Sequence, residues 1–216
     1  MRPDWDETVA LDGRRLGRRG MQTRRRLLDA TEELLREKGL RDLRVVDIAR
    51  RVGSSPATFY QYFKDADAAV LALAWEIADA MAPVVEIIDG PWDAEEGIER
   101  ARRLIAAYVD FWDLHHAVMR VRNLAAEEGD QRFRDARVAS VGQLTDHLCA
   151  QIGVFRDAGR VSRRIDPYAA AASLVAMLER VGAYHSELER GGLTPESMIE
   201  TPAMIVYQTV TGTQAA

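Results

Sequence analysis

Cysteine is nearly absent from this sequence, and so are the features that mark exported or membrane-inserted proteins. The single cysteine, Cys149, excludes an internal disulfide. The chain begins MRPDWDET without the apolar region of a secretory signal, and its uninterrupted apolar runs fall short of the roughly 18 residues that a membrane span needs. We therefore expect a cytoplasmic protein without a membrane segment.

Recognisable catalytic and metal-binding patterns are also missing. His115 and His116 are adjacent, so on a helix their side chains point about 100° apart and do not readily bind one metal ion. The sequence has no E-x-x-H pattern of a helical di-metal site, no nucleophile elbow around a serine and no G-K-[S/T] phosphate loop. We expect no catalytic residue, no metal and no cofactor. A helical metal enzyme is the alternative, which metal analysis of the protein would reveal.

The net charge of −5 is unevenly distributed along the 216 residues. Residues 1–64 carry 15 basic and 10 acidic side chains, a balance of +5, whereas the remainder carries 14 basic and 24 acidic ones, a balance of −10. Such asymmetry concentrates positive potential at one end of the protein. Seven arginines fall in a window without acids: Arg14, Arg15, Arg18, Arg19, Arg24, Arg25 and Arg26. Two interpretations of residues 1–20 stay open. They are a flexible basic arm that follows DNA, or a solvated tail without a partner.

The most informative stretch is VVDIARRVGSSPATFYQYF, residues 45–63. Apolar residues at i, i+3, i+4 and i+7 from Val45 predict a helix of about two turns, which Gly53 ends because glycine enters the left-handed conformation without steric cost. Ser55 can accept a hydrogen bond from the backbone N–H of residue 57 or 58, and Pro56 suits the first helical position. These signals predict a helix-turn-helix.

The second of these helices has two faces of different chemistry. Phe59 and Phe63 lie on one side, while small or polar residues occupy the other. A slim polar face of this kind fits a major groove about 12 Å wide, where Gln61 can pair with adenine and the Thr58 methyl can touch thymine. Tyr60 and Tyr62 have the reach for phosphates. A surface helix-turn-helix without a DNA role is the alternative.

The segment IARRVGSSPATFYQYF resembles the TetR/AcrR family pattern I-A-x-x-x-G-x-S-x-x-T-x-Y-x-x-F. The matching residues are Ile48, Ala49, Gly53, Ser55, Thr58, Tyr60 and Phe63. The resemblance covers about a quarter of the chain and implies an all-helical homodimeric repressor: an N-terminal three-helix helix-turn-helix DNA-binding domain plus a C-terminal helical domain for ligand binding and dimerisation. We expect residues 21–66 to form the DNA-binding domain and residues 67–216 to form the ligand-binding and dimerisation domain.

Two positions depart from the family pattern. Where the family usually has Thr or Ser before the first helix, this chain has Leu43 and Arg44, so we expect Asp42 to cap the helix and Arg44 to reach a phosphate. The usual Lys after the second helix is replaced by Ala66, with Lys64 nearby. The expected DNA-binding residues are Arg44, Ser54, Ser55, Pro56, Ala57, Thr58, Tyr60, Gln61, Tyr62 and Lys64.

The rest of the chain reads as helices, with no strand-like alternation. Apolar spacing and breakers predict helices over 22–38, 67–88 with a kink or break at Pro83, 93–116, 117–128 and 131–152. Asp166-Pro167 opens a helix that is apolar nearly all round, and Thr194-Pro195 opens a last one that Pro202 can interrupt. We expect these last two helices to form a homodimer interface.

Large side chains in the C-terminal part are mostly expected in the core, but ligand sites between helices have a similar composition. The candidate ligand-binding residues are Trp75, Tyr108, Phe111, Trp112, Met119, Asn123, His147, Met177 and Tyr184. The expected effector is an apolar or amphipathic small molecule. It would release a dimeric repressor from a near-palindromic double-stranded DNA operator. A transcriptional activator and a helical small-molecule-binding protein without DNA binding are the alternatives.

Overall fold

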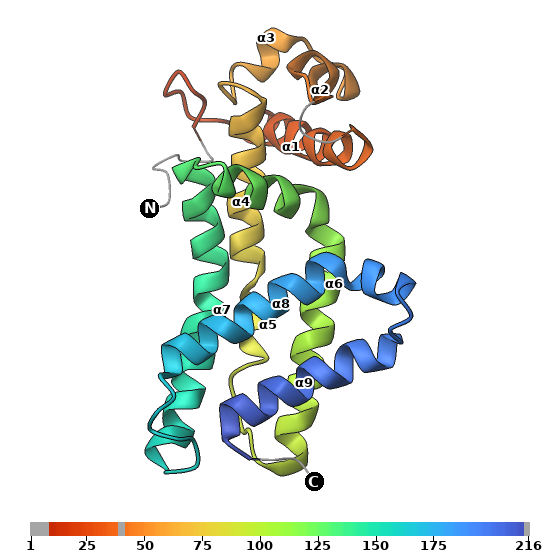
Figure 1. Ribbon diagram of the computed structural model, residues 1–216. Helices are drawn as coiled ribbons and strands as arrows, with labels where there is room; N and C mark the ends of the chain where they lie inside the picture. The colour runs from red at the N-terminus through yellow and green to blue at the C-terminus, as the bar shows by residue number, and fades with distance from the viewer. Residues whose placement is uncertain (1–8, 39–41, 214–216) are drawn as a thin grey trace. The chain divides into compact units, whose positions relative to one another are not determined.

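The computed structural model describes residues 9–38 and 42–213, and this part of the chain is all-helical (Figure 1). Its only strand-type pairing is an isolated antiparallel bridge between Val9 and Arg15. The helices are α1 (Arg18–Lys38), α2 (Val45–Arg51), α3 (Pro56–Phe59), α4 (Ala66–Ala80), α5 (Ala82–Glu86), α6 (Ala94–Glu127), α7 (Gln131–Asp157), α8 (Pro167–Arg190) and α9 (Pro195–Thr211). The predicted all-α class is confirmed.

The described part of the chain forms two compact units, and the domain boundary expected between residues 66 and 67 stays a prediction. The first unit takes the chain up to Asp79 together with Ala117–Val138, and the second takes Ala80–His116 and the chain from Ala139 onward. The long helices α6 and α7 each contribute to both units. Spacing along the sequence could not predict this, because it shows where a helix ends but not which part of it packs with which neighbour.

Several predicted helix boundaries need correction. Helix α1 begins at Arg18, so part of the expected N-terminal arm is helical. The helices expected over 93–116 and 117–128 are one, α6, since neither glycine nor proline stands at residues 116–117. Helix α7 runs on to Asp157 instead of ending at residue 152. Pro202 lies inside α9 without ending it, and is buried together with Ala203.

Other predicted helix starts and breaks are confirmed. A break does separate α4 from α5 at Met81, where Pro83 occupies the first turn of α5. By length and hydropathy alone the segment Ala66–Glu86 could cross a membrane, but 67% of the apolar window is buried, as in a core helix. Asp166 and Thr194 cap α8 and α9 through side-chain oxygens that accept from the backbone N–H of Ala169 and Ser197. Gly39, the breaker expected to end the helix over 22–38, lies outside the described residues.

The second unit is held together by close packing around α6. Gly97 allows α6 to approach the Tyr207 ring of α9. Gly182 allows α8 to approach the Tyr108 ring of α6. At one end Arg100 is buried and donates to the carbonyl oxygens of Ile87, Asp89 and Pro91, which fixes the turn after α5. Arg102 of α6 also binds Glu200 of α9 with two hydrogen bonds, of 2.6 and 2.8 Å. The Arg100 contacts thus place a buried guanidinium against backbone carbonyls, and the more exposed Arg102–Glu200 pair joins α6 to α9.

Gly97→Ala should destabilise the protein, because a Cβ at this position would overlap the Trp92 carbonyl and lie 2.8 Å from the Tyr207 ring. We expect a loss of about 1–3 kcal/mol in the free energy of unfolding, the usual range for overpacking. The control is Gly142→Ala in α7, where a Cβ meets nothing within 4 Å. That change should be stabilising by up to about 1 kcal/mol through helix propensity. Equal effects in urea denaturation would contradict this packing.

Candidate nucleic-acid interface

The turn between α2 and α3 has the geometry that its residues predict. Gly53 has φ 68°, the left-handed conformation that glycine adopts freely. The Ser55 hydroxyl accepts a hydrogen bond of 3.2 Å from the backbone N–H of Thr58, and Pro56 occupies the first position of α3. Helix α3 ends at Phe59, and residues 60–62 continue as a turn instead of the longer helix expected up to residue 63.

Two phenylalanine rings fix the orientation of α3. Phe59 is completely buried and Phe63 nearly so, with 5.4 Å between their ring centroids. The guanidinium of Arg24, on α1, lies 5.2 Å from the centre of the Phe63 ring. Because one side of this segment is anchored, residues such as Tyr60, which is 52% exposed, and Gln61 remain on the surface.

The ten predicted DNA-binding residues all lie in the first unit, and none is buried. Those with exposed side chains are Arg44, Ser55, Ala57, Tyr60, Gln61 and Lys64, and those that are half-buried are Ser54, Pro56, Thr58 and Tyr62. The Ser55 and Thr58 hydroxyls share a hydrogen bond of 3.1 Å. The segment therefore presents a row of small, hydroxyl and amide groups with the size and chemistry that base edges require.

The start of α2 differs from the expectation that Asp42 caps it. Its N-cap residue is Arg44, whose extended backbone precedes the helix and whose side chain makes no capping bond. The Arg44 carbonyl accepts the N–H of Asp47 and Ile48 instead. Asp42 lies two residues too early to cap the helix, and the Arg44 side chain stays exposed.

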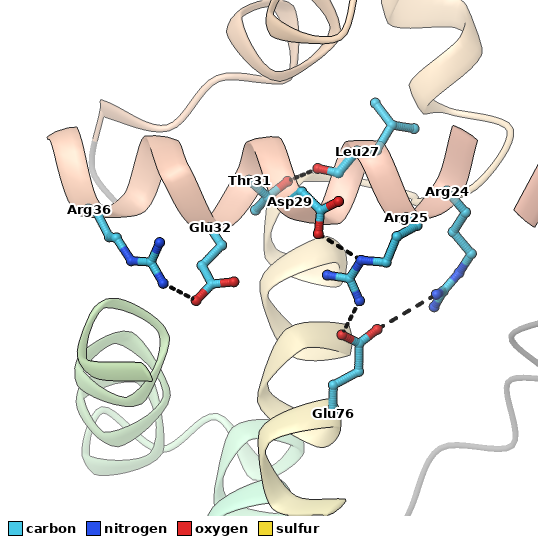
Figure 2. A network of polar contacts seen from close by, with 8 residues as sticks. All are labelled: Arg24, Arg25, Leu27, Asp29, Thr31, Glu32, Arg36 and Glu76. Carbon is cyan, nitrogen blue, oxygen red and sulfur yellow. Dashed lines mark hydrogen bonds and ion pairs between the residues drawn. The ribbon is translucent and has the colours of Figure 1, made fainter. Parts of the chain in front are cut away.

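Part of the arginine-rich window has a structural role that charge alone could not reveal. In α1, Arg25 donates to Glu76 of α4 at 2.6 Å and to Asp29 at 2.7 Å, and Arg24 pairs with Glu76 at 3.9 Å (Figure 2). Arg26 donates to the Val52 carbonyl at 2.8 Å. These three arginines, which lie beyond the arm expected over residues 1–20, join α1 to α4 and to the end of α2.

A second ionic contact joins α2 to α1. Arg51 donates to Glu33 at 3.0 Å and to both carboxylate oxygens of Glu37, at 3.0 and 2.8 Å. These hydrogen bonds lower the pKa of Glu37 and raise that of Arg51. The contact is exposed, so it orients α2 more than it stabilises the fold.

The candidate ligand residues are divided between the two units. Trp75, Met119 and Asn123 belong to the first unit, whereas the second contains Tyr108, Phe111, Trp112, His147, Met177 and Tyr184. Trp75, Tyr108, Phe111, Trp112 and Met119 are buried.

Within the second unit, Tyr108 and Trp112 both flank Gly182 of α8. His147 bonds Asp89 at 2.8 Å, and the Arg180 guanidinium lies 3.8 Å from the centre of the Tyr184 ring. Met177 is half-buried on α8. The packing therefore brings Tyr108, Trp112 and α8 together, while His147 and Tyr184 have surface partners of their own. In the described part of the chain, no group of three or more His, Cys, Asp or Glu is placed to hold a metal ion.

Comparison with known families is consistent with this architecture. Residues 27–73 match the model described as bacterial regulatory proteins, tetR family, and residues 84–216 match that of the tetracyclin repressor-like C-terminal domain. The second match alone covers more than half of the chain. The protein belongs to the TetR family. It is a DNA-binding transcriptional regulator, and regulators of this family are generally not enzymes.

Individual relatives match most of the length of this regulator. It is 27% identical over 208 residues to the HTH-type transcriptional regulator EthR of Mycolicibacterium smegmatis, with 93% of this chain and 92% of that one covered. A Rhodococcus sp. structure described as a TetR-family transcriptional regulator matches at 20% identity with a TM-score of 0.67, over 88% of this chain and 99% of that one. A SmeT–triclosan complex matches at 18% identity with a TM-score of 0.62, over 88% and 90%.

Glu76→Gln should loosen the contact between α1 and α4, because it removes the charge that Arg24 and Arg25 share. We expect a loss of about 1 kcal/mol in unfolding free energy, since the pair is partly exposed and Gln keeps one acceptor oxygen. The matched control is Glu32→Gln, which breaks only the (i, i+4) pair with Arg36 and should cost about 0.5 kcal/mol or less. If both variants unfold at the same urea concentration, Glu76 does not join the helices.

Proposed function

We propose that this regulator is a homodimeric repressor that leaves its operator when an apolar or amphipathic small molecule binds. Two helix-turn-helix units, each formed by residues 45–63, enter successive major grooves about 34–36 Å apart on a near-palindromic site. The effector favours a conformation with unsuitable spacing between these units. A coupling free energy of about 1–3 kcal/mol suffices for release.

The observation that carries the DNA-binding role is the contrast between the two sides of α3 and the turn after it. Phe59 and Phe63 are buried, whereas Ala57, Tyr60 and Gln61 are exposed. Gln61 supplies the donor and acceptor pair that matches adenine, and Tyr60 supplies a hydroxyl for a phosphate. The positive balance of residues 1–64 supports the same role.

The proposed dimer interface lies on α8 and α9, which pack against each other within one chain. Both helices leave apolar side chains exposed: Tyr168 is 60%, Tyr184 37% and Ile205 43% accessible in the single chain. Exposed apolar side chains on two neighbouring helices favour association with a second copy, since large apolar patches are rarely left in water. The two-fold arrangement would form a four-helix interface.

The proposed effector follows from the apolar side chains around α6 and α8. Tyr108, Trp112 and Met177 lie on these helices, and a site between helices favours an apolar molecule with a few polar groups. The SmeT structure, a distant relative in fold, is a complex with triclosan, which supports a ligand of this kind. Since its proposed target is the cell's own DNA, the protein would act in the cytoplasm.

The proposed function is tested by binding to the DNA that flanks the protein's own gene. Affinity is measured across a salt series, with and without an apolar cell extract. We expect tight binding that weakens steeply with salt, by counterion release, and further with the extract. Binding that the extract strengthens would contradict release by ligand, and absence of salt-dependent binding would contradict the DNA-binding assignment.

Tyr60→Phe should weaken DNA binding without unfolding the protein, because it removes only an exposed hydroxyl. A lost hydrogen bond of about 0.5–1.5 kcal/mol corresponds to roughly two- to tenfold in affinity. Fluorescence anisotropy with labelled duplex measures the affinity, and a melting curve controls for stability. An unchanged affinity would count against the phosphate contact.

Gln61→Ala should relax sequence preference at a single base pair of each half-site. Loss of a two-bond contact to a base costs about 1–3 kcal/mol in discrimination. Competition with duplexes that differ at one position measures this preference. If every position keeps its preference, Gln61 does not read a base.

A further inference from the structure

The arginines near the N-terminus differ in whether the folded protein already uses them. Arg24, Arg25 and Arg26 are engaged, as described above. By contrast, Arg15, Arg18 and Arg19 are exposed, and their side chains make no ion pair or hydrogen bond within the described residues. Three positive charges are therefore available for an external partner.

The segment before α1 has a defined path beside the turn that follows α3. The N–H of Leu11 donates a 3.0 Å hydrogen bond to the carbonyl of Gln61, one of the residues proposed to read bases. Ala10 is buried, and its N–H donates to the Arg14 carbonyl at 2.9 Å. Together with the bridge between Val9 and Arg15, these bonds form a small folded segment (Figure 1, red) that contacts the helix-turn-helix unit.

The position of two of these arginines is unfavourable for the helix itself. Arg18 and Arg19 occupy the first turn of α1, and this turn contains no acidic residue. Cations at a helix N-terminus are repelled by the helix dipole, so these residues do not help the helix to form. An anionic partner would offset this repulsion.

We propose that residues 9–19 form an anchored second contact with duplex DNA, an inference that rests on the proposed function. The Leu11–Gln61 hydrogen bond holds the segment next to the base-reading residues, and Arg15, Arg18 and Arg19 bind phosphates that flank the bases read by α3. Phosphate contacts of this kind position a protein and raise its affinity for all sequences.

The first test replaces the three arginines with alanine in the full-length protein and measures binding to a random-sequence duplex of about 40 base pairs. Each lost phosphate contact should reduce the slope of log affinity against log salt concentration by about 0.9. At 0.1 M salt this change corresponds to roughly eightfold weaker binding. The matched control replaces Arg103, Arg163 and Arg164, three exposed arginines of the second unit, and should bind like the wild type. Equal losses in both variants would mean that net charge alone acts.

The second test removes the anchor without changing any charge. Leu11 is the second residue of a tight turn that the 2.9 Å bond from the Gly13 N–H to the Ala10 carbonyl closes. Proline is favoured at this position, so Leu11→Pro should keep the turn but lose the N–H that binds Gln61. We expect about fivefold weaker binding, the scale of one hydrogen bond. The melting temperature should change little, because proline reduces the entropy of the unfolded chain and so offsets the lost bond.

The results separate this inference from the proposed function. Weaker binding by both variants, with a wild-type control, supports the anchored contact. If only the arginine variant binds less tightly, the charges act without the anchor and the inference is wrong. If wild type and variants bind equally, the inference alone fails. If the wild type shows no salt-dependent binding to any duplex, the proposed function fails with it.

Discussion

The surface proposed to bind DNA depends on the anchoring of two phenylalanine rings. Helix α3 has four residues, far below the length at which a helix is stable by itself, so its direction must come from packing. Phe59 and Phe63 provide that packing, and Arg24 lies over the second ring. Because Arg24 also pairs with Glu76, the same contact fixes α1 and α4. The exposed residues keep a defined direction only while this cluster remains intact.

Local rules predicted the helix-turn-helix because its geometry depends on adjacent residues. Gly53 adopts the left-handed conformation, Ser55 caps α3 and Pro56 begins it, as their positions in the sequence predict. Asp42 did not become the cap of α2, since the N-cap position falls two residues later, at Arg44. A residue can cap a helix only if the helix begins directly after it. Apolar periodicity does not locate the start of a helix to within one or two residues.

Contacts between distant residues were not predictable from spacing. The sequence shows that the arginines are numerous, but not that Arg24 and Arg25 would share Glu76 on another helix. One signal was present: Glu76 is the only acid between Asp67 and Asp79, in an otherwise apolar run, and an isolated acid in such a helix requires a cation. Likewise, Tyr108 and Trp112 are recognisable in the sequence as large side chains suited to a core or a ligand site, but their shared neighbour Gly182 is not.

The proposed mode of recognition is that a dimer reads DNA through two copies of residues 45–63. Selection of bound sequences from a randomised duplex library tests it most directly, since every possible operator competes in one experiment. We expect enrichment of a near-palindromic sequence whose half-sites are centred about one helical turn, roughly 34–36 Å, apart. Enrichment of a single half-site without a symmetric partner would contradict the dimeric arrangement, and no enrichment would contradict base reading.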